Sequence, residues 1–459
     1  MPNTKETVGI VGGGLVGSVL SIFLAKRGIS SEIYEHRPDI RLGKSAGRSI
    51  NLAVSTRGLH ALREIGLEKE ILGEAVPMYG RMIHSVQEEQ TFLRYGKDDS
   101  ECIYSISRAG LNRALLSQAE KTQRVKIHFQ QKVTHLDLAS GELFLKGETS
   151  HSVQHSAILA TDGSGSLIRS ALMQLPGYEF SQEYLDYGYK ELSIPALEDG
   201  KFQLEKNALH IWPRGTFMLI ALPNYDGSFT CTLFLPLKGE VSFASLNQPA
   251  DVRKFLATQF PDAYRLIPHG IEEFFANPTG NMVTVKCFPW HYADRVCLLG
   301  DAAHAIVPFF GQGMNCGFED CTVLDELLAS QSSPDWKALF SDLSRLRKVH
   351  TDAIADMAVE NFEEMRSKVG NARFLLEKEV EKILQKNFPQ EYVSRYAMVT
   401  FSRIPYQMAY QSGLAQNEIL SELCRNLERP EDVDLQQARA LIHSRLGPLN
   451  LPSSPSKGN

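Results

Sequence analysis

The first residues of this sequence whose types and spacing could do chemistry are three glycines near its start. Gly12, Gly14 and Gly17 give the pattern G-x-G-x-x-G directly after an apolar run, residues 7–11, and directly before a helical pattern. Glycines at this spacing allow a tight turn, let a pyrophosphate approach the backbone, and let a helix pack closely on a strand. Glu35 follows a second strand, roughly 20 residues further on, where an acidic side chain binds a ribose hydroxyl. The pattern predicts a dinucleotide-binding unit; the alternative is a glycine-rich turn that serves only packing.

Two later stretches place an acid and glycines at the end of a predicted strand. Thr161-Asp162-Gly163 follows the apolar run 157–160, and Gly300-Asp301 follows the run 295–299. In open α/β sheets, ligands bind at the carboxyl ends of the strands. A cofactor that touches such distant parts of the chain is long and buried, which favours FAD over a dissociable NAD. No second G-x-G-x-x-G is present for a nicotinamide cofactor, so such a cofactor is expected to dock only transiently.

An α/β fold must position these stretches. The pattern predicts a Rossmann-like FAD-binding domain interleaved with an antiparallel β-sheet substrate domain, followed by a C-terminal α-helical region. Residues 187–236 indicate the substrate sheet, because they are rich in aromatic and β-branched types and alternate in character. The predicted boundaries are 1–53, 101–180 and 284–330 for the FAD-binding domain, 54–100 and 181–283 for the substrate domain, 331–446 for the helical region, and 447–459 for a disordered tail.

Composition excludes several classes of protein. The 459 residues carry a net charge of −6, which gives no basic surface for nucleic acid. Seven scattered cysteines without a C-x-x-C pair argue against a disulfide framework and a metal site, and suit a reducing compartment. The dinucleotide pattern begins too near Met1 for a signal peptide, and no run of about 18 apolar residues could span a membrane. A cytoplasmic location is therefore expected.

A polar, basic stretch follows Glu35. It is read either as a solvated loop or, because it leaves the second strand of a dinucleotide fold, as a loop that contacts the cofactor. Its basic residues are Arg37, Arg41, Lys44, Arg48 and Arg57.

Three motifs together resemble the single-component flavoprotein aromatic hydroxylases, the group of para-hydroxybenzoate hydroxylase. They are the glycine fingerprint with Glu35, the Asp162-Gly163 motif, and the motif Gly300-Asp301-Ala302-Ala303-His304 followed by Pro308 and Gly311-Gln312-Gly313. Within that group the sequence resembles the kynurenine 3-monooxygenase family over nearly its full length. The matching stretches are residues 47–53, 81–84, 210–213, 229–234, 307–315 and 398–403.

The resemblance implies tightly bound FAD, transient NADPH, and O2. It implies hydroxylation of L-kynurenine to 3-hydroxy-L-kynurenine through a flavin C4a-hydroperoxide, a step of the kynurenine pathway of tryptophan degradation. The aniline nitrogen of kynurenine already donates into the ring, so no catalytic acid or base is expected, and the protein has to position the ring and exclude water. His304 is interpreted as a structural residue rather than a base.

Family positions also imply the site residues. Pro308, Phe309, Gly311 and Gln312 would line the flavin and substrate site, with the role of Phe310 left open. Substrate binding would fall to Arg81, Tyr95, Asn361, Tyr396, Phe309, Glu364 and Met365, with Arg81 as a clamp for the carboxylate. Cofactor binding would fall to Gly12, Gly14, Leu15, Val16, Gly17, Glu35, Arg37, Ala53, Arg108, Asp162, Asp301, Gly313, Met314 and Asn315.

The C-terminal end departs from the family's animal members, which continue into a hydrophobic membrane anchor. Residues 417–446 are polar and amphipathic, so no anchor is expected, and this end either caps the pocket or forms a homodimer contact. Three alternatives remain for function: a hydroxylase of another aromatic substrate, a flavin oxidase or reductase of the same fold, and a catalytically silent flavin-binding protein.

Overall fold

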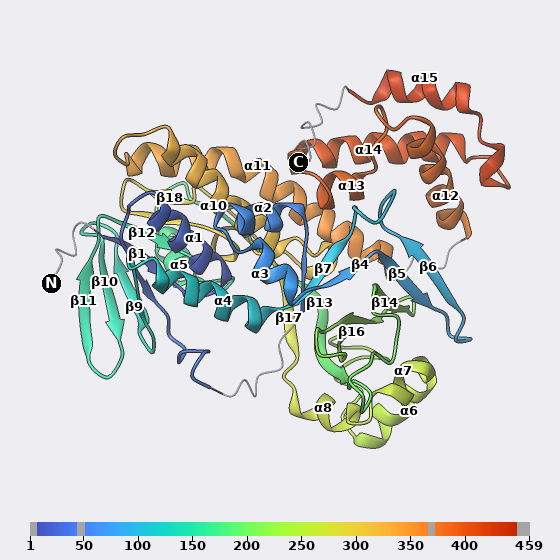
Figure 1. Cartoon of the computed structure of the whole chain (residues 1–459), viewed down its shortest axis with the longest axis horizontal. Helices are drawn as coiled ribbons and strands as arrows, with labels where there is room; N and C mark the ends of the chain where they lie inside the picture. Colours follow the sequence, from blue (N-terminus) through green and yellow to red (C-terminus); the bar gives the residue numbers. More distant parts are fainter. Residues whose placement is uncertain (1–6, 44–50, 366–371, 448–459) are drawn as a thin grey trace.

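The computed structural model describes residues 7–43, 51–365 and 372–447. A six-stranded sheet with the order β18-β19-β12-β1-β2-β8 forms the centre of the first half of the molecule (Figure 1), and all its pairs are parallel except β18 with β19. Its strands are β1 (Val8–Val11), β2 (Ser31–Tyr34), β8 (Val125–His128), β12 (Ala157–Ala160), β18 (His291–Tyr292) and β19 (Val296–Leu298). The sequences VGIV of β1 and AILA of β12 are buried throughout, as expected for parallel strands covered on both faces.

Helices from three parts of the chain pack around this sheet. Helix α1 contacts both α4 and α10, although these elements lie far apart in sequence. The helices of this half are α1 (Leu15–Lys26), α2 (Thr56–Glu64), α3 (Glu68–Gly73), α4 (Arg108–Lys121), α5 (Leu167–Leu172), α9 (Asp301–His304) and α10 (Gly313–Ala329). The short 3₁₀ turn η2 (Pro308–Phe310) precedes α10. The order of elements therefore interleaves the cofactor segments with the rest of the chain.

Two three-stranded antiparallel sheets flank the main sheet. One has the order β11-β10-β9 and the other β3-β7-β4. Their strands are β9 (Lys132–Asp137), β10 (Glu142–Lys146), β11 (Ser150–Gln154), β3 (Asn51–Val54), β7 (Ile103–Ser107) and β4 (Val76–Met78). Helices α2 and α3 share one apolar core with the six-stranded sheet through Ala61, Leu62 and Ile71. Of the predicted substrate segment 54–100, only β5 and β6 join the substrate sheet. The boundary at residue 53 therefore falls too early, because an amphipathic helix does not show which sheet it covers.

The second large sheet has seven strands in the order β17-β13-β16-β15-β14-β5-β6. They are β5 (Gly80–His84), β6 (Gln90–Arg94), β13 (Glu179–Ile194), β14 (Ala208–Pro213), β15 (Met218–Pro223), β16 (Phe229–Pro236) and β17 (Gly280–Phe288). All its pairs are antiparallel except β14 with β5, which arrive from distant parts of the chain. One face is covered by α6 (Pro249–Gln259), α7 (Pro261–Leu266) and α8 (Gly270–Ala276). The other face packs against the helical region through Phe234, Phe309 and Phe362.

The C-terminal region is helical, as predicted, and lies above the seven-stranded sheet in Figure 1. Its elements are α11 (Trp336–Glu363), α12 (Ala372–Asn387), α13 (Arg395–Thr400), α14 (Tyr406–Leu423), η4 (Pro430–Asp432) and α15 (Leu435–Arg445). Among the described helices, none combines the length and the apolar character that crossing a membrane requires. The predicted tail falls, apart from Gly447, outside the described residues. The predicted α/β class, with its separate sheet and helical end, is confirmed.

Candidate active site

The glycine turn after β1 has a geometric reason for two of its three glycines. Gly12 has a φ of +100°, and a Cβ there would lie 2.6 Å from the Thr161 carbonyl oxygen. A Cβ on Gly17 would lie 2.1 Å from the Gly12 carbonyl oxygen, so only glycine lets α1 approach the strand so closely. Gly14 differs, because a Cβ there would meet nothing within 4 Å, and no side chain caps the N-terminus of α1. The start of α1 is therefore free of a side-chain cap and has room beside Gly14.

The acidic residue after β2 turns toward this glycine turn. Glu35 is buried and accepts hydrogen bonds from the backbone N–H of Gly13 (2.9 Å) and of Arg37 (2.9 Å). The Arg37 side chain is mostly exposed and lies 4.0 Å from the Glu35 carboxylate. The strand end thus presents a carboxylate beside the helix N-terminus, which is the arrangement that the spacing predicts.

Two more strand ends meet the start of α1. Val16 packs against Gly300 and Gly317, where an added Cβ would lie 3.0 Å and 2.7 Å from its methyl group. Arg169 ties two of the loops together, since its guanidinium donates to the carbonyl oxygens of Ala302 (2.8 Å) and Ser164. Three loops that the sequence separates by more than a hundred residues therefore form one edge, at the carboxyl ends of β1, β12 and β19.

The acids on these loops differ in their surroundings. Asp162 accepts hydrogen bonds from the N–H groups of Leu167 (2.9 Å) and Ile168 (3.4 Å) at the start of α5, while its second oxygen is buried without a partner. Asp301 is reached by solvent, yet burial raises the pKa of its carboxyl, and the positive charges of His304 and Arg108 offset this only in part. Asp301 is therefore open to solvent at this edge of the sheet, with other chain segments close to its carboxyl.

The 308–315 turn leads from η2 into α10 and is held from one side by β3. Gly311 adopts the left-handed conformation (φ +65°), and a Cβ there would lie 3.3 Å from the Ala53 methyl group. Asn315 donates to the carbonyl oxygens of Ala53 (2.9 Å) and Gly311 (2.8 Å) and accepts from the Ser55 N–H (2.9 Å). Gln312 accepts a hydrogen bond from the Tyr406 hydroxyl (2.8 Å). No side chain caps α10, so its N-terminal N–H groups, including those of Gly313 and Met314, are available to an anionic group.

A recess, here named the Arg81 recess, consists of Arg81, Tyr95, Tyr396 and Phe310. The Arg81 guanidinium lies 5.4 Å from the Tyr95 ring centre and 5.2 Å from that of Tyr396, and these two rings stack at 5.2 Å. Phe310 stacks on the other side of Tyr396 at 5.8 Å. The recess thus joins β5, the end of β6 and α13 to the 308–315 turn.

The Arg81 side chain forms no ion pair with a carboxylate among the described residues, and its buried Nε has no hydrogen-bond partner. Burial by itself would lower the pKa of Arg81, but the Tyr95 and Tyr396 hydroxyls and the Glu364 carboxylate raise it above its usual value. The guanidinium is therefore charged and interacts with the Tyr95 hydroxyl, while its Nε is left without a partner.

The remaining substrate candidates come from the end of α11. Asn361 donates to the Phe309 carbonyl oxygen (2.6 Å) and lies 3.5 Å from the sulfur of Met365. Glu364 lies 4.0 Å from the Lys378 ammonium on α12. Phe309 stacks on Phe362 at 4.2 Å, so its ring belongs to the apolar core between the sheet and α11.

His304 belongs to a group of charged side chains, here named the buried ion cluster: His304, Glu319, Asp320, Arg347 and Arg57. Asp320 accepts from His304 Nε2 (2.6 Å), Arg347 Nε (2.8 Å) and the Gly300 N–H (2.9 Å). His304, Cys316 and Asp320 lie close enough together to consider a metal ion. Arg347 donates to both Asp320 and Glu319 and lies 3.4 Å from the Cys316 sulfur, so the cations of the cluster already satisfy these carboxylates.

Comparisons with known proteins decide the family. Residues 5–334 match the family described as FAD binding domain. A kynurenine 3-monooxygenase of Myxococcus xanthus is 57% identical over 448 residues, covering 97% of this chain and 96% of its own length. A kynurenine 3-monooxygenase of Dictyostelium discoideum is 44% identical, covering 96% and 98%. The chain belongs to the kynurenine 3-monooxygenase family.

Solved structures support the fold of this family member. A tetrameric 2-methyl-3-hydroxypyridine-5-carboxylic acid oxygenase matches with a TM-score of 0.65 at 18% identity, covering 82% of this chain and 96% of its own. The p-nitrophenol 4-monooxygenase PnpA of Pseudomonas putida matches with a TM-score of 0.63 at 20% identity, covering 92% and 98%. At these identities the likeness shows the flavin-hydroxylase fold alone.

The site of this family member fits FAD, its cofactor. The uncapped starts of α1 and α10 offer N–H groups to anionic parts of the cofactor, and the turn at Gly14 leaves room for a pyrophosphate. The second oxygen of Asp162 is buried and unpartnered, and the Asp301 side chain is exposed at the same edge. These features lie along one edge of the sheet, as a long dinucleotide requires.

The basic residues that follow Glu35 have different surroundings in the structure. Arg41 pairs with Asp39 and Glu120, and Lys44 and Arg48 lie outside the described residues. Arg57 is neither a solvated loop residue nor a cofactor ligand: it is 1% exposed and donates to Glu319 and to carbonyl oxygens of the C-terminal region. The sequence did not lead us to predict the buried ion cluster. Arg57 was named only as part of the basic stretch, and Glu319, Asp320 and Arg347 were not singled out. The adjacent acids Glu319-Asp320 inside an apolar helix were the available signal, because buried carboxylates require cations.

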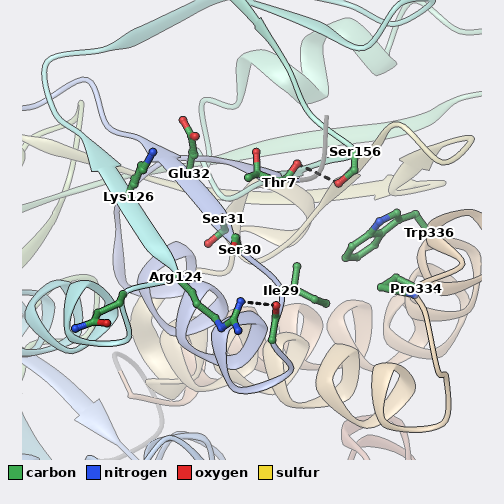
Figure 2. A pocket seen from close by; sticks show the side chains of 12 residues that line it. Thr7, Ile29, Ser30, Ser31, Glu32, Arg124, Lys126, Ser156, Pro334 and Trp336 are labelled. Atoms are coloured by element: carbon green, nitrogen blue, oxygen red, sulfur yellow. Dashed lines mark hydrogen bonds between the residues drawn. The ribbon is translucent and has the colours of Figure 1, made fainter. Parts of the chain in front are cut away.

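A separate cavity of about 540 Å³ lies at the opposite edge of the six-stranded sheet (Figure 2). Its lining includes Thr7, Ser31, Arg124 and Ser156, which stand at the starts of the parallel strands rather than at their ends. Arg124 donates to the Gly28 carbonyl oxygen (2.9 Å), and Ser156 to that of Thr7 (3.0 Å). The cavity is thus distinct from the edge at which such sheets bind ligands.

Proposed function

We propose that the protein is a FAD-dependent monooxygenase that hydroxylates L-kynurenine to 3-hydroxy-L-kynurenine. The balanced reaction consumes NADPH, a proton and O2 and releases NADP⁺ and water. The observation that carries this proposal is the Arg81 recess. A charged, half-buried guanidinium, which forms no ion pair with a carboxylate among the described residues, lies beside two stacked tyrosines, and one of these rings stacks on Phe310 of the 308–315 turn. A substrate that joins a carboxylate to an aromatic ring matches this arrangement.

FAD, when bound, takes a hydride from NADPH and activates O2. Gly12, Gly14, Leu15, Val16 and Gly17 would hold its pyrophosphate and Glu35 its ribose, while the carboxylates of Asp162 and Asp301 would face its middle. The N-terminus of α10, at Gly313, Met314 and Asn315, would stabilise negative charge on the reduced ring. Ala53, Arg37 and Arg108 lie on neighbouring elements and complete the proposed cofactor site.

On the substrate side, Arg81 would bind the carboxylate, with the hydroxyls of Tyr95 and Tyr396 assisting. The ammonium group would face Asn361 and Glu364. Asn361 keeps its amide oxygen for this purpose, because its nitrogen is the atom that donates to Phe309. Phe309, Pro308 and Met365 would border the aromatic ring.

The chain has to position the ring and exclude water rather than move protons. The aniline nitrogen of the substrate makes the neighbouring ring carbon electron-rich, so the ring needs no base to activate it. His304 is bound to Asp320 and buried within the ion cluster, which leaves it no contact with a substrate. The catalytic contribution of the protein is thus geometric and electrostatic.

The test is NADPH oxidation by the purified protein, loaded with FAD, with and without L-kynurenine. Strong stimulation with one 3-hydroxykynurenine formed per NADPH supports the proposal. Stimulation that yields only hydrogen peroxide indicates an oxidase or a non-substrate effector. Stimulation by a different carboxylated aromatic, with none by kynurenine, indicates a hydroxylase of another substrate.

The same proposal includes the setting of the enzyme. All seven cysteines are free and buried, which supports a reducing, cytoplasmic location. A homodimer contact at the C-terminal helices stays a prediction, to be checked by the mass of the protein in solution.

A further inference from the structure

Arg57 connects the cofactor half of the molecule to the C-terminal helices. It lies in the first turn of α2, directly after β3, and is 1% exposed. Its Nε donates to Glu319 on α10 (2.9 Å). Its two terminal nitrogens donate to three backbone carbonyl oxygens of the C-terminal region, those of Val399 (2.5 Å), Ser402 (2.9 Å) and Ile404. One side chain therefore uses most of its donors on a segment more than 300 residues away.

The carbonyl groups that Arg57 binds belong to the end of α13 and to the loop that leads into α14. The last carbonyls of a helix have no partner within the helix, so a buried helix end needs donors from elsewhere. Arg57 supplies them and thereby fixes the end of α13. Helix α13 carries Tyr396, whose ring forms part of the Arg81 recess.

The same side chain also reaches the 308–315 turn. The Arg57 guanidinium lies 3.8 Å from the centre of the Tyr406 ring, and the Tyr406 hydroxyl donates to Gln312 (2.8 Å). Gln312 in turn donates to Ser55, two residues before Arg57 (3.3 Å). The turn at one end of the site and the recess at the other are thus held by the same residue.

Neutralising Glu319 does not account for this arrangement. Arg347 donates to the second oxygen of Glu319 (2.7 Å) and already places a cation there. Three of the four acceptors of Arg57 are neutral carbonyl groups in one short segment. Such a distribution matches a residue that locates a segment rather than one that only balances a charge.

We propose that Arg57 is a positioning residue that sets the distance between the bound aromatic ring and the flavin, by holding α13 against α2 and the 308–315 turn. This inference rests on the proposed hydroxylase function. If α13 shifts, the ring leaves its reactive position, and a displacement of about 1 Å can cost a hundredfold in rate. The electrons of NADPH then reduce O2 to hydrogen peroxide: NADPH, a proton and O2 give NADP⁺ and H2O2, and the substrate is not oxidised.

The experiment compares Arg57→Lys with the wild type, both loaded with FAD and saturated with L-kynurenine. Lysine keeps the charge beside Glu319 but cannot donate to three carbonyls in a planar fork. We expect NADPH oxidation to continue, 3-hydroxykynurenine formation to fall about tenfold, and hydrogen peroxide per NADPH to rise several-fold. Amide hydrogen exchange should quicken in residues 395–404 and stay unchanged at the glycine turn. The matched control is Arg63→Lys on the same helix, which is exposed and pairs with Glu68 rather than with α13; it should behave like the wild type.

The outcomes separate three cases. A folded, flavin-loaded Arg57→Lys with wild-type coupling and unchanged exchange at residues 395–404 overturns the proposal. If that variant does not fold, Arg57→Met with Glu319→Gln also removes the carboxylate oxygen that would lose its donor, and loss of FAD from this variant as well assigns Arg57 to the scaffold and overturns the proposal. If the wild type forms no 3-hydroxykynurenine, the proposed function fails instead, and hydrogen exchange alone then decides whether Arg57 holds α13.

Discussion

Arg347 is buried and Arg81 is half-buried with a buried Nε, and the two arginines differ in their partners. Arg347 donates to Asp320 (2.8 Å) and Glu319 (2.7 Å), and these carboxylates raise its pKa further despite its burial. Arg81 lies beside two stacked tyrosine rings, with its Nε unpartnered and no carboxylate paired to it among the described residues. A buried charge is costly unless it is paired.

The difference teaches how to separate structural from ligand-binding charge. In the buried ion cluster each carboxylate has at least one cation, and the pKa values of Glu319 and Asp320 are lowered although burial alone would raise them. Such a cluster is complete without a ligand. In the proposed function, the anion at the Arg81 recess is the carboxylate of the substrate. Variants at the two sites should therefore change different properties.

The largest effect is expected at Arg347. Arg347→Met leaves Glu319 and Asp320 buried with fewer cations, and breaking such a pair costs about 3–5 kcal/mol of folding free energy. Urea unfolding of the purified protein measures this loss. Adding Asp320→Asn to the variant should restore part of the stability, and a loss below about 1 kcal/mol would remove the basis of the comparison.

Arg81→Met should act on binding instead. Loss of charge-assisted hydrogen bonds to the substrate carboxylate is expected to raise the KM for kynurenine roughly a hundredfold. Stability should change little, because Arg81 is half-buried and forms no ion pair with a carboxylate among the described residues, and FAD should stay bound. Arg94→Met on β6, whose partner Asp99 is exposed, is the control. A variant that loses its flavin while its KM is unchanged would contradict the placement of Arg81.

A third cluster avoids the cost of burial by keeping a histidine neutral. His210 Nε2 faces the Glu205 carbonyl oxygen (2.8 Å) and must donate, so its Nδ1 accepts from His84 (2.9 Å), which pairs with Asp262 (2.7 Å). Burial lowers the pKa of His210 from 6.5 to about 4.

The pH dependence follows from that shift. Below pH 6.5 His210 binds a proton in the unfolded chain but stays neutral in the folded protein. The contribution of His210 to the free energy of unfolding is therefore present above pH 6.5 and is lost as the pH falls toward 4. Between about pH 7.5 and about pH 5 the loss amounts to about 2 kcal/mol. Urea unfolding at the two pH values should show a smaller difference for His210→Asn than for the wild type. Equal differences would mean that His210 is charged in the folded protein.

The smallest effect is expected for an arginine pair at the surface. Arg27 donates to both oxygens of Asp325 (2.7 and 2.8 Å), but its side chain is 37% exposed. Arg27→Met should change stability by less than about 1 kcal/mol, and less still at high salt. A loss like that of Arg347→Met would show that burial is not what separates these arginines.

The glycine fingerprint and its strand ends could be predicted from sequence because their cause is local. The φ of Gly12 and the close approach at Gly17 depend on neighbouring residues and on one adjoining strand, so the spacing alone carries them. The alternation of β16 likewise predicted a sheet with a buried face. The parallel pairing of β14 with β5 could not be predicted, because these strands are far apart in the chain. Alternation of side chains along a strand shows which face is buried but does not show which other strand pairs with it.

The sequence by itself determined the fold class and the family, and it predicted the edge for the cofactor, since these follow from motifs that are short and contiguous. Only the tertiary structure decided which partners each arginine has and how far it is buried. In the sequence Arg57 is one basic residue in a polar stretch, and only the fold places the end of α13 beside it. Arg81 and Arg347 are the same residue type and differ in their surroundings. The energy of a charge depends on its partners and on its access to water, and both are set by contacts between distant segments.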